Sequence, residues 1–314
     1  MRPGFYIAVF LIFSAKLSAQ TGTFVKSPVT SWGMVQRIPE FRSAYIGTRT
    51  IDILVPDEYP GHPTERYPVL YMHDGQMLFD SSETWNHQEW GVDEALKQYN
   101  KKTGKSCIVV GIHNAGQNRY AEYFPKKPFE MLSSQGKEKI ALLAEKQESR
   151  RMGEDGPASD LYLQFLAKEV KPMVDEAFRT KKEAASTFIC GSSMGGLISL
   201  YALCELPKIF GAAACLSTHW PGIFDDNQNP VPAAFLKYLS EKAPSSSAHR
   251  IYMDCGTAGL DSLYPKYHLQ AEKILKSKGY SGNKMKSRIV KGANHSEQAW
   301  KARMPEVLEF LLGK

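Results

Sequence analysis

The feature that most constrains the fold is a serine between glycines, Gly191-Ser192-Ser193-Met194-Gly195, which matches the pattern G-x-S-x-G. A short apolar run, Thr187 to Cys190, precedes it, and an Ala- and Leu-rich segment, Leu197 to Leu206, follows it. Strand, sharp turn and helix are the context of a nucleophile elbow, in which a strained turn lifts one serine above a sheet. We expect a Cβ at Gly191 or Gly195 to clash there. The pattern favours Ser193 as a nucleophile over an ordinary Gly/Ser turn.

The first 19 residues have the pattern of a secretory signal peptide. Arg2 supplies a positive charge, Phe5 to Phe13 an apolar stretch, and Leu17-Ser18-Ala19 small residues suited to cleavage. The apolar run is roughly half the ~20 residues that a membrane span needs, and an uncleaved anchor is the alternative. We therefore expect a secreted or periplasmic protein with no membrane span. Residues 20–40 are assigned to an N-terminal extension and 41–314 to a single domain.

Charge and cysteine content argue against several classes of protein. The formal net charge is +6, but the basic clusters, Lys101-Lys102-Lys105 and Arg179-Lys181-Lys182, follow predicted helices. Cations suit a helix C-terminus, so we expect solvated surface and no nucleic-acid partner. Five cysteines without paired spacing predict no disulfide framework. Neither CxxC nor HExxH occurs, so we expect no metal site and no cofactor.

Short apolar runs alternate with helical patterns along the chain. Runs that are apolar on both faces are typical of parallel strands covered by helices on both sides, and the alternation predicts an α/β doubly wound sheet. An early extended stretch, 41–55, is expected to add an antiparallel edge. The predicted strands are 67–73, 107–113, 187–190, 212–216, 250–255 and 287–290. The predicted helices are 92–99, 161–178, 197–206, 233–239, 267–278 and 297–312.

The segment 126–160 differs from this pattern. It contains prolines, Lys-rich and Glu-rich runs and Gly153-Glu154-Asp155-Gly156-Pro157, and a solvated helix is expected near 136–151. Two interpretations stay open: a lid over the site, or a surface insertion.

A serine nucleophile needs a base that an acid holds in one tautomer. In α/β folds with an elbow the chain order is serine, acid, histidine, so the base lies after Ser193. His249 precedes a strand and His268 lies inside a predicted helix. His295 follows the last strand, at the carboxyl edge where sites form in parallel sheets. We therefore favour His295 over these two and over His219.

The loop after the strand 250–255 offers two candidates for the acid. Asp254 is still in the strand, whereas Asp261 lies beyond Gly256-Thr257-Ala258-Gly259, with room to turn toward an imidazole. We favour Asp261 and keep Asp254 as the alternative. Backbone N–H groups usually stabilise the oxyanion, and those of Met194 and of Gln76, in the turn His73-Asp74-Gly75-Gln76, are the candidates.

Four stretches together resemble the Putative esterase family of α/β-hydrolases: Tyr71 to Asp80, Asn118 to Pro125, Gly191 to Gly196 and Asn294-His295-Ser296-Glu297. The resemblance runs from roughly Phe41 to the C-terminus and implies an α/β-hydrolase fold. The family includes feruloyl and acetylxylan esterases, S-formylglutathione hydrolases, siderophore esterases and mycolyltransferases. Its acid commonly follows Gly-Thr closely, and the gap from Thr257 to Asp261 is slightly longer. We expect Arg119 and Glu122 to tie their loop together by an ion pair.

These features together predict an exported serine esterase that removes acyl or feruloyl groups from small-molecule or polysaccharide esters. Trp85, Trp90 and Trp220 lie in loops expected near the site, where they would stack on a sugar or aromatic ring or pack in the core. An acyltransferase using the same triad is one alternative, and a catalytically silent carbohydrate-binding module is another. Product analysis with and without a sugar acceptor distinguishes the acyltransferase from the hydrolase. Labelling by a fluorophosphonate probe excludes the catalytically silent module.

Overall fold

A computed structural model describes residues 27–145, 152, 156–223 and 229–313. The predicted signal peptide lies outside the described residues, as do parts of the segment 126–160. None of the helices within the described ranges is both long and apolar enough to cross a bilayer.

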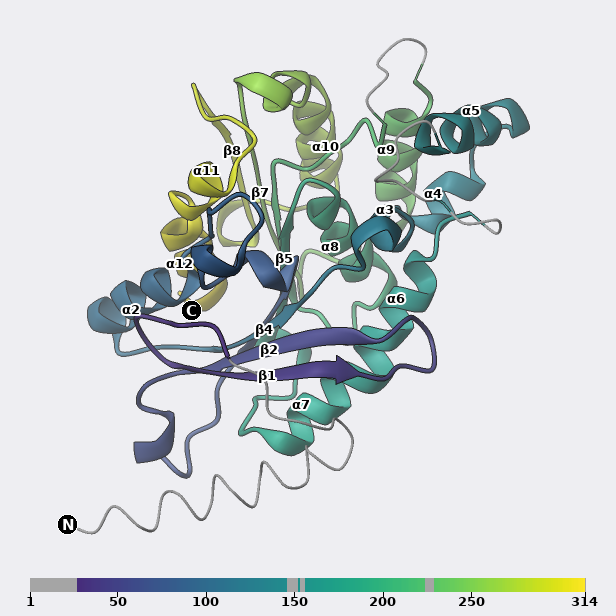
Figure 1. Ribbon diagram of the computed structural model, residues 1–314. Helices are drawn as coiled ribbons and strands as arrows, with labels where there is room; N and C mark the ends of the chain where they lie inside the picture. Colours follow the sequence, from purple (N-terminus) through teal and green to yellow (C-terminus); the bar gives the residue numbers. More distant parts are fainter. Residues whose placement is uncertain (1–26, 146–151, 153–155, 224–228, 314) are drawn as a thin grey trace, which may run out of the picture.

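The core of the protein is one eight-stranded sheet in the order β1-β2-β4-β3-β5-β6-β7-β8 (Figure 1). β1 pairs antiparallel with β2, and β2 pairs antiparallel with β4, whereas every later pairing is parallel. The mostly parallel sheet and its antiparallel N-terminal edge are therefore confirmed. The strands are β1 Met34–Phe41, β2 Arg49–Val55, β3 Val69–His73, β4 Ile108–Ile112, β5 Thr187–Ser192, β6 Ala212–Leu216, β7 Arg250–Gly256 and β8 Met285–Val290.

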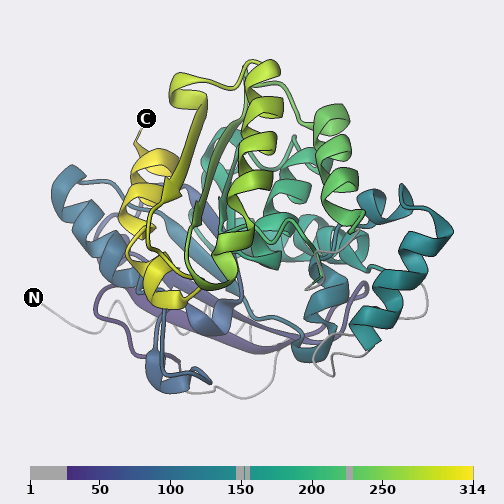
Figure 2. The same cartoon turned by 90° about the horizontal axis from the view of Figure 1, so that it is seen from above.

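Helices cover both faces of the sheet (Figure 2). Both faces need cover because both are apolar, as alternate residues of β3 illustrate. Val69 and Tyr71 belong to one hydrophobic cluster, and Leu70 and Met72 belong to another. α2 and α12 pack on the second cluster, and α6 to α10 on the first. The main helices are α2 Val92–Thr103, α3 Arg119–Tyr123, α4 Lys126–Glu130, α5 Ser134–Glu145, α6 Ser159–Phe165, α7 Lys171–Ala177, α8 Met194–Glu205, α9 Val231–Lys242, α10 Pro265–Ser277, α11 Glu297–Lys301 and α12 Met304–Leu312.

Two boundaries differ from the sequence-based expectation. The sheet begins at Met34, so its antiparallel edge includes residues that had been assigned to an N-terminal extension. The predicted helix 161–178 is divided into α6 and α7 by a wider π turn, Leu166–Val170. Pro172 follows this turn at the start of α7. Proline has no N–H, so Pro172 cannot donate a backbone hydrogen bond to the preceding turn of the helix. The wider π turn occupies that preceding turn.

The segment 126–160 is partly helical. α4 packs against α9, and α5 covers the first part of the predicted solvated helix. The rest of that predicted helix lies outside the described residues. Lys127 of α4 forms an ion pair with Glu205 of α8, so the start of the segment is attached to the helix that follows the elbow.

The turn between β5 and α8 brings two backbones into direct contact. A Cβ added at Gly191 would lie 2.7 Å from the carbonyl oxygen of Gly195. At Gly195 itself the nearest atoms to an added Cβ, on His73 and Asp74, are 3.5 Å away, which is ordinary contact. The expected clash is therefore present at Gly191, and the expectation for Gly195 is wrong. The second close position is Gly196, whose Cβ would lie 2.8 Å from Thr218 Oγ1.

We predict that Gly191→Ala lowers the free energy of unfolding by about 1–3 kcal/mol, because the methyl group overpacks against backbone that cannot rotate away. Urea denaturation measures the change. Gly47→Ala is the matched control, since an added Cβ there meets nothing within 4 Å and should change stability by less than about 0.5 kcal/mol. Equal free energies of unfolding for the two variants would contradict the close packing at Gly191.

Candidate active site

The loops at the carboxyl ends of the parallel strands carry the predicted site residues. Ser193 follows β5, Asp261 follows β7 and His295 follows β8. Because the carboxyl ends of parallel strands meet at one edge of a sheet, the three residues lie along the same edge, in the chain order serine, acid, histidine.

Ser193 has a strained backbone. Its φ of 58° and ψ of −122° lie in a region that residues with a Cβ rarely adopt. Several hydrogen bonds hold this conformation: the Ser193 N–H donates to Leu216 O at 3.0 Å, and the N–H groups of Gly196 and His219 donate to Ser193 O at 3.0 and 3.1 Å. Strain of this kind clusters at functional sites. The side chain of Ser193 is partly exposed, whereas Ser192 is buried.

Asp261 and His295 form a hydrogen bond of 2.6 Å between Oδ1 and Nδ1. The carboxylate is fully buried and also accepts from Ser217 Oγ and from the Gly256 N–H, both at 2.6 Å. Burial by itself raises the pKa of Asp261, but the hydrogen bonds from His295 and Ser217 outweigh it and hold that pKa below its usual value. An ionised carboxylate only accepts, so the proton lies on Nδ1 of His295. In the neutral imidazole with this tautomer, Nε2 carries the lone pair.

The loops that carry Asp261 and His295 are fastened to each other. The N–H groups of Thr257 and Ala258 both donate to Ala293 O at 3.0 Å. A Cβ at Gly256 would lie 2.1 Å from that carbonyl oxygen, so only glycine allows the approach. Asp261 lies within a 3₁₀ turn, Gly259–Leu263, and the start of this turn accommodates the longer spacing between Thr257 and the acid.

Asp254, the alternative acid, faces other partners. It accepts from Arg303 Nη1 at 2.7 Å, from Tyr252 OH at 3.0 Å and from the Ser217 N–H at 3.2 Å. Burial raises its pKa to about 6, although Arg303 opposes the shift. The structure therefore brings Asp261, and not Asp254, to His295.

Ser217 is one of two residues of this cluster, with Arg303, that sequence reasoning missed. Its hydroxyl donates to Asp261 and accepts from Trp300 Nε1 and Arg303 Nη2, both at 3.1 Å. Its φ of 41° is unusual for a residue with a side chain. Its place directly after β6, at the carboxyl edge, was the available signal.

Two aromatic side chains pack around the imidazole of His295. The ring of Trp300 meets it edge to face at 5.0 Å, and that of Tyr264 at 5.7 Å. The Tyr264 hydroxyl shares a hydrogen bond of 2.7 Å with Nδ1 of the His219 ring. The backbone N–H of His219 donates to the carbonyl of Ser193. Tyr264 thus connects the histidine loop with the elbow.

The turn after β3 carries Gln76 and lies against the elbow. Asp74 has a left-handed backbone, and the first hydrogen bond of the turn runs from Met77 N to Asp74 O at 2.9 Å. Gln76 lies one residue before the first donor of this turn, and Met194 is the first residue of α8. Such first N–H groups have no partner within their helix. A Cβ at Gly75 would lie 2.5 Å from the Gly111 backbone, so glycine is required here.

The ion pairs of Arg119 and Glu122 differ from the expectation that the two residues pair with each other. Arg119 donates to both oxygens of Asp74, at 2.6 and 2.8 Å, and Asn114 adds a third hydrogen bond at 2.7 Å. Glu122 instead pairs with Arg49 of β2 at 2.6 Å. The two side chains lie one turn of α3 apart and diverge, so α3 fastens the turn after β3 to the antiparallel edge.

The three predicted tryptophans have different surroundings. Trp85 is 83% exposed, and the side chain of its neighbour Asn86 donates to Glu297, close to His295, at 2.9 Å. Trp90 is 2% exposed and packs against Trp300, with ring centres 5.4 Å apart. Trp220 is also 2% exposed.

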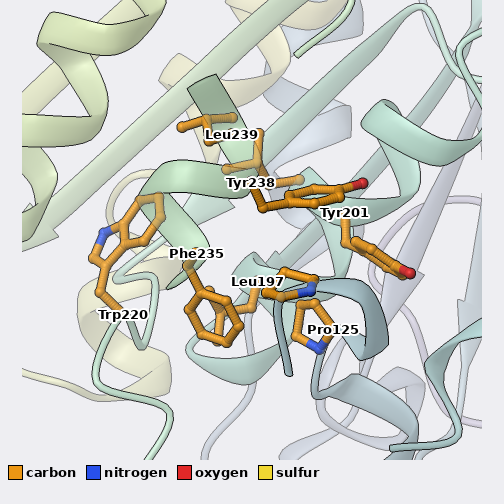
Figure 3. Close-up of a pocket in the computed structure, with 9 residues that line it drawn as sticks. Pro125, Leu197, Tyr201, Trp220, Phe235, Tyr238 and Leu239 are labelled. Carbon is orange, nitrogen blue, oxygen red and sulfur yellow. The ribbon is translucent and has the colours of Figure 1, made fainter. Parts of the chain in front are cut away.

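Trp220 lines a small apolar pocket beside α8, with a cavity volume of about 20 Å³. Figure 3 shows Trp220 and Tyr201 at opposite ends of this pocket, with Phe235 and Leu197 between them. Leu197 lies one helical turn after Ser193, and its N–H donates to the Ser193 carbonyl at 3.3 Å. The pocket therefore begins next to the elbow.

Comparison with known proteins identifies related sequences. Residues 43–311 match the family described as "Putative esterase". The "Uncharacterized protein YbbA" of Bacillus subtilis (strain 168) is 24% identical over 275 residues, covering 85% of this chain and 94% of that protein.

Solved structures share the fold at low sequence identity. A ferulic acid esterase has a TM-score of 0.62 at 15% identity, covering 90% of this chain and 98% of its own. An IroE-like serine hydrolase from Shewanella oneidensis has a TM-score of 0.60 at 19% identity, covering 87% of this chain and 78% of its own. These likenesses show the α/β-hydrolase fold.

We predict that Arg119→Met lowers the free energy of unfolding by about 3–5 kcal/mol near pH 7, because Asp74 is left as a buried charge without its cation. Burial raises the pKa of Asp74, but Arg119 outweighs it and lowers that pKa. An aspartate in an unfolded chain has a pKa of about 3.9. The wild-type contribution of Asp74 is therefore full above about pH 4 and is lost only as the pH falls through its lower folded pKa.

Without Arg119, burial raises the pKa of Asp74, and the destabilisation should shrink as acid protonates it. Urea denaturation from pH 7 to about pH 4 measures this narrowing gap. Arg288→Met is the control, because its ion pair with Glu306 is partly exposed and should contribute less than about 1 kcal/mol. If the difference in free energy of unfolding between the wild type and Arg119→Met stayed constant with pH, Arg119 would not be the counter-charge of Asp74.

Proposed function

The chain belongs to the Putative esterase family, and we propose that it is an exported serine esterase acting on acetyl- or feruloyl-type esters of carbohydrates. Family membership supports ester hydrolysis. The observation that carries the mechanism is the 2.6 Å hydrogen bond between Asp261 and His295, on the edge where Ser193 occupies a strained turn. Export is proposed from the N-terminal sequence alone.

The proposed reaction begins with proton transfer. Nε2 of His295 removes the proton of Ser193 Oγ as that oxygen forms a bond to the ester carbonyl carbon. The imidazolium then gives this proton to the leaving alcohol when the C–O bond breaks, which leaves an acyl-enzyme. Water, activated by the same imidazole, releases the carboxylic acid and regenerates Ser193. Asp261, held ionised, stabilises the imidazolium that forms in both halves.

We propose that the N–H groups of Met194 and Gln76 stabilise the oxyanion. Both begin helical turns, so neither N–H has a partner within its own helix. The turn of Gln76 is fixed by Asp74 and Arg119, so its donor would be held in place before the reaction begins. Donors that need no reorganisation are a large source of rate enhancement.

The proposed substrate class rests on the surroundings of the triad. Trp85 presents an exposed ring on a loop fastened to Glu297, in a position to stack on a sugar or an aromatic acyl group. One protein of the same fold is named a ferulic acid esterase.

We predict that Ser193→Ala abolishes hydrolysis of methyl ferulate and of acetylated xylo-oligosaccharides, together with labelling by a fluorophosphonate probe. Ser192→Ala is the matched control and should keep most of the activity, because Ser192 is the last residue of β5 and is buried. Product analysis by mass spectrometry measures both. Loss of activity only in Ser192→Ala would place the nucleophile one residue earlier, and hydrolysis of neither ester by the wild type would refute the substrate class.

We predict that Asp261→Asn lowers kcat by about 10⁴-fold while the protein stays folded, because the amide holds the imidazole in the wrong tautomer. Asp254→Asn should act mainly on stability, since it removes the charge that pairs with the buried Arg303. Measurement of kcat together with the melting temperature separates the two effects. The assignment would be reversed if Asp254→Asn alone lost activity at an unchanged melting temperature.

A further inference from the structure

A second pocket lies at the edge of the sheet opposite the triad. Its cavity volume is about 240 Å³, a little below the range of about 300–1,000 Å³ usual for small-molecule sites, so it suits a small ligand. Residues at or just before the amino ends of β3, β4, β5 and β7 line it, together with the end of α12. None of the proposed catalytic residues contributes to it.

The charged side chains that line this pocket are mostly cations. Arg66, Lys105, Lys181 and Arg250 line it, and the acidic residue in the lining is Glu65, which already accepts hydrogen bonds from His62 and Tyr67. The sequence predicted the lysine clusters at 101–105 and 179–182 to be solvated surface. Lys105 and Lys181 are indeed exposed, and the fold brings these two lysines, one from each cluster, to the same pocket.

Arg250 is the buried cation of the pocket. It is 5% exposed, and its guanidinium donates to the carbonyls of Phe310 and Leu311, at the end of α12. These carbonyls, at the negative end of the α12 dipole, and the rings of Phe188 and Phe310 stabilise the guanidinium, but they supply only partial charges. In the described part of the chain no carboxylate pairs with Arg250, and burial lowers its pKa. A buried charge without a counter-charge favours the binding of an anion.

Ser106 gives an independent indication of a ligand. Its side chain is 7% exposed and lines the same pocket. Its Oγ has no hydrogen-bond partner among the described residues. Buried hydroxyl groups are nearly always paired. This one is enclosed as it stands, and rotation about χ1 to another staggered rotamer would present it to an acceptor in the pocket.

The rest of the lining is mixed, with the hydroxyl of Ser186 beside several apolar side chains. Tyr67, Phe188, Leu311 and Leu312 are each less than a tenth exposed and form the walls. A free inorganic ion would leave these walls in contact with water. An anion on an apolar body would cover them and place its charge next to Arg250, Lys181 and the hydroxyl of Ser106.

We propose that this pocket binds a small organic anion, with a carboxylate or phosphate group on an apolar or aromatic body. The anionic group meets Arg250, Lys181 and Ser106, and the body packs between Phe188, Tyr67 and the end of α12. The proposal does not depend on the esterase reaction, since the pocket and the triad lie at opposite edges of the sheet.

The test is isothermal titration of the full-length protein with phenyl phosphate, at an ionic strength held constant with sodium chloride. Ser106→Ala should weaken binding about tenfold or more, because it removes a hydrogen bond to a charged group. It should leave the melting temperature unchanged, since the hydroxyl has no partner within the described protein. Lys181→Met should weaken binding severalfold. Lys273→Met, which changes an exposed lysine on α10, is the control and should bind as the wild type does.

Further ligands define the chemistry of the site. Benzoate tests a carboxylate on the same body, and at least one of benzoate and phenyl phosphate should bind more tightly than inorganic phosphate. Equal affinity for inorganic phosphate would overturn the assignment to an organic anion. Absence of binding by both aromatic anions at millimolar concentrations would overturn the site, and so would equal affinity in Ser106→Ala, Lys181→Met and the wild type.

Discussion

The arrangement of the candidate active site depends on two aspartates buried at the carboxyl end of β7. Asp254 and Asp261 are both fully buried, and the hydroxyl or backbone of Ser217 contacts each of them. Two carboxylates this deep in a protein would repel each other and resist ionisation. Arg303 pairs with Asp254, while His295, Ser217 and the Gly256 N–H satisfy Asp261. The partners therefore give chemically identical groups different roles, one structural and one proposed to be catalytic.

The sequence was sufficient to predict most of the fold because the parallel strands are short runs that are apolar on both faces. It also made Ser193 and His295 the candidate nucleophile and base, because the patterns that mark them are local in the sequence: a turn between strand and helix, and a loop after the last strand. Ser217 and Arg303 were missed because their importance arises from contacts between segments far apart in the chain. The partner of Arg119 was wrong for the same reason, since spacing along a helix suggested Glu122, whereas the fold brings Asp74 within reach.

Two elements extend from one edge of the sheet to the other. β7 begins with Arg250, in the proposed anion pocket, and contains Asp254 near its carboxyl end. α12 begins directly after Arg303, which pairs with Asp254, and ends at Leu312, in the pocket. Residues that shape both sites are therefore carried by one strand, which lies next to the edge strand β8, and by one helix. Both elements belong to the packed core and not to the surface loops.

The different exposure of the tryptophans gives the protein a built-in optical reporter. Four of the five indoles, Trp32, Trp90, Trp220 and Trp300, are less than a tenth exposed, whereas Trp85 projects into solvent. A water-soluble quencher such as iodide collides with an exposed indole and is excluded from buried ones. The quenchable part of the intrinsic fluorescence therefore comes mainly from one ring. A ligand that covered this ring, as proposed, would reduce the quenching and so be detected without any label.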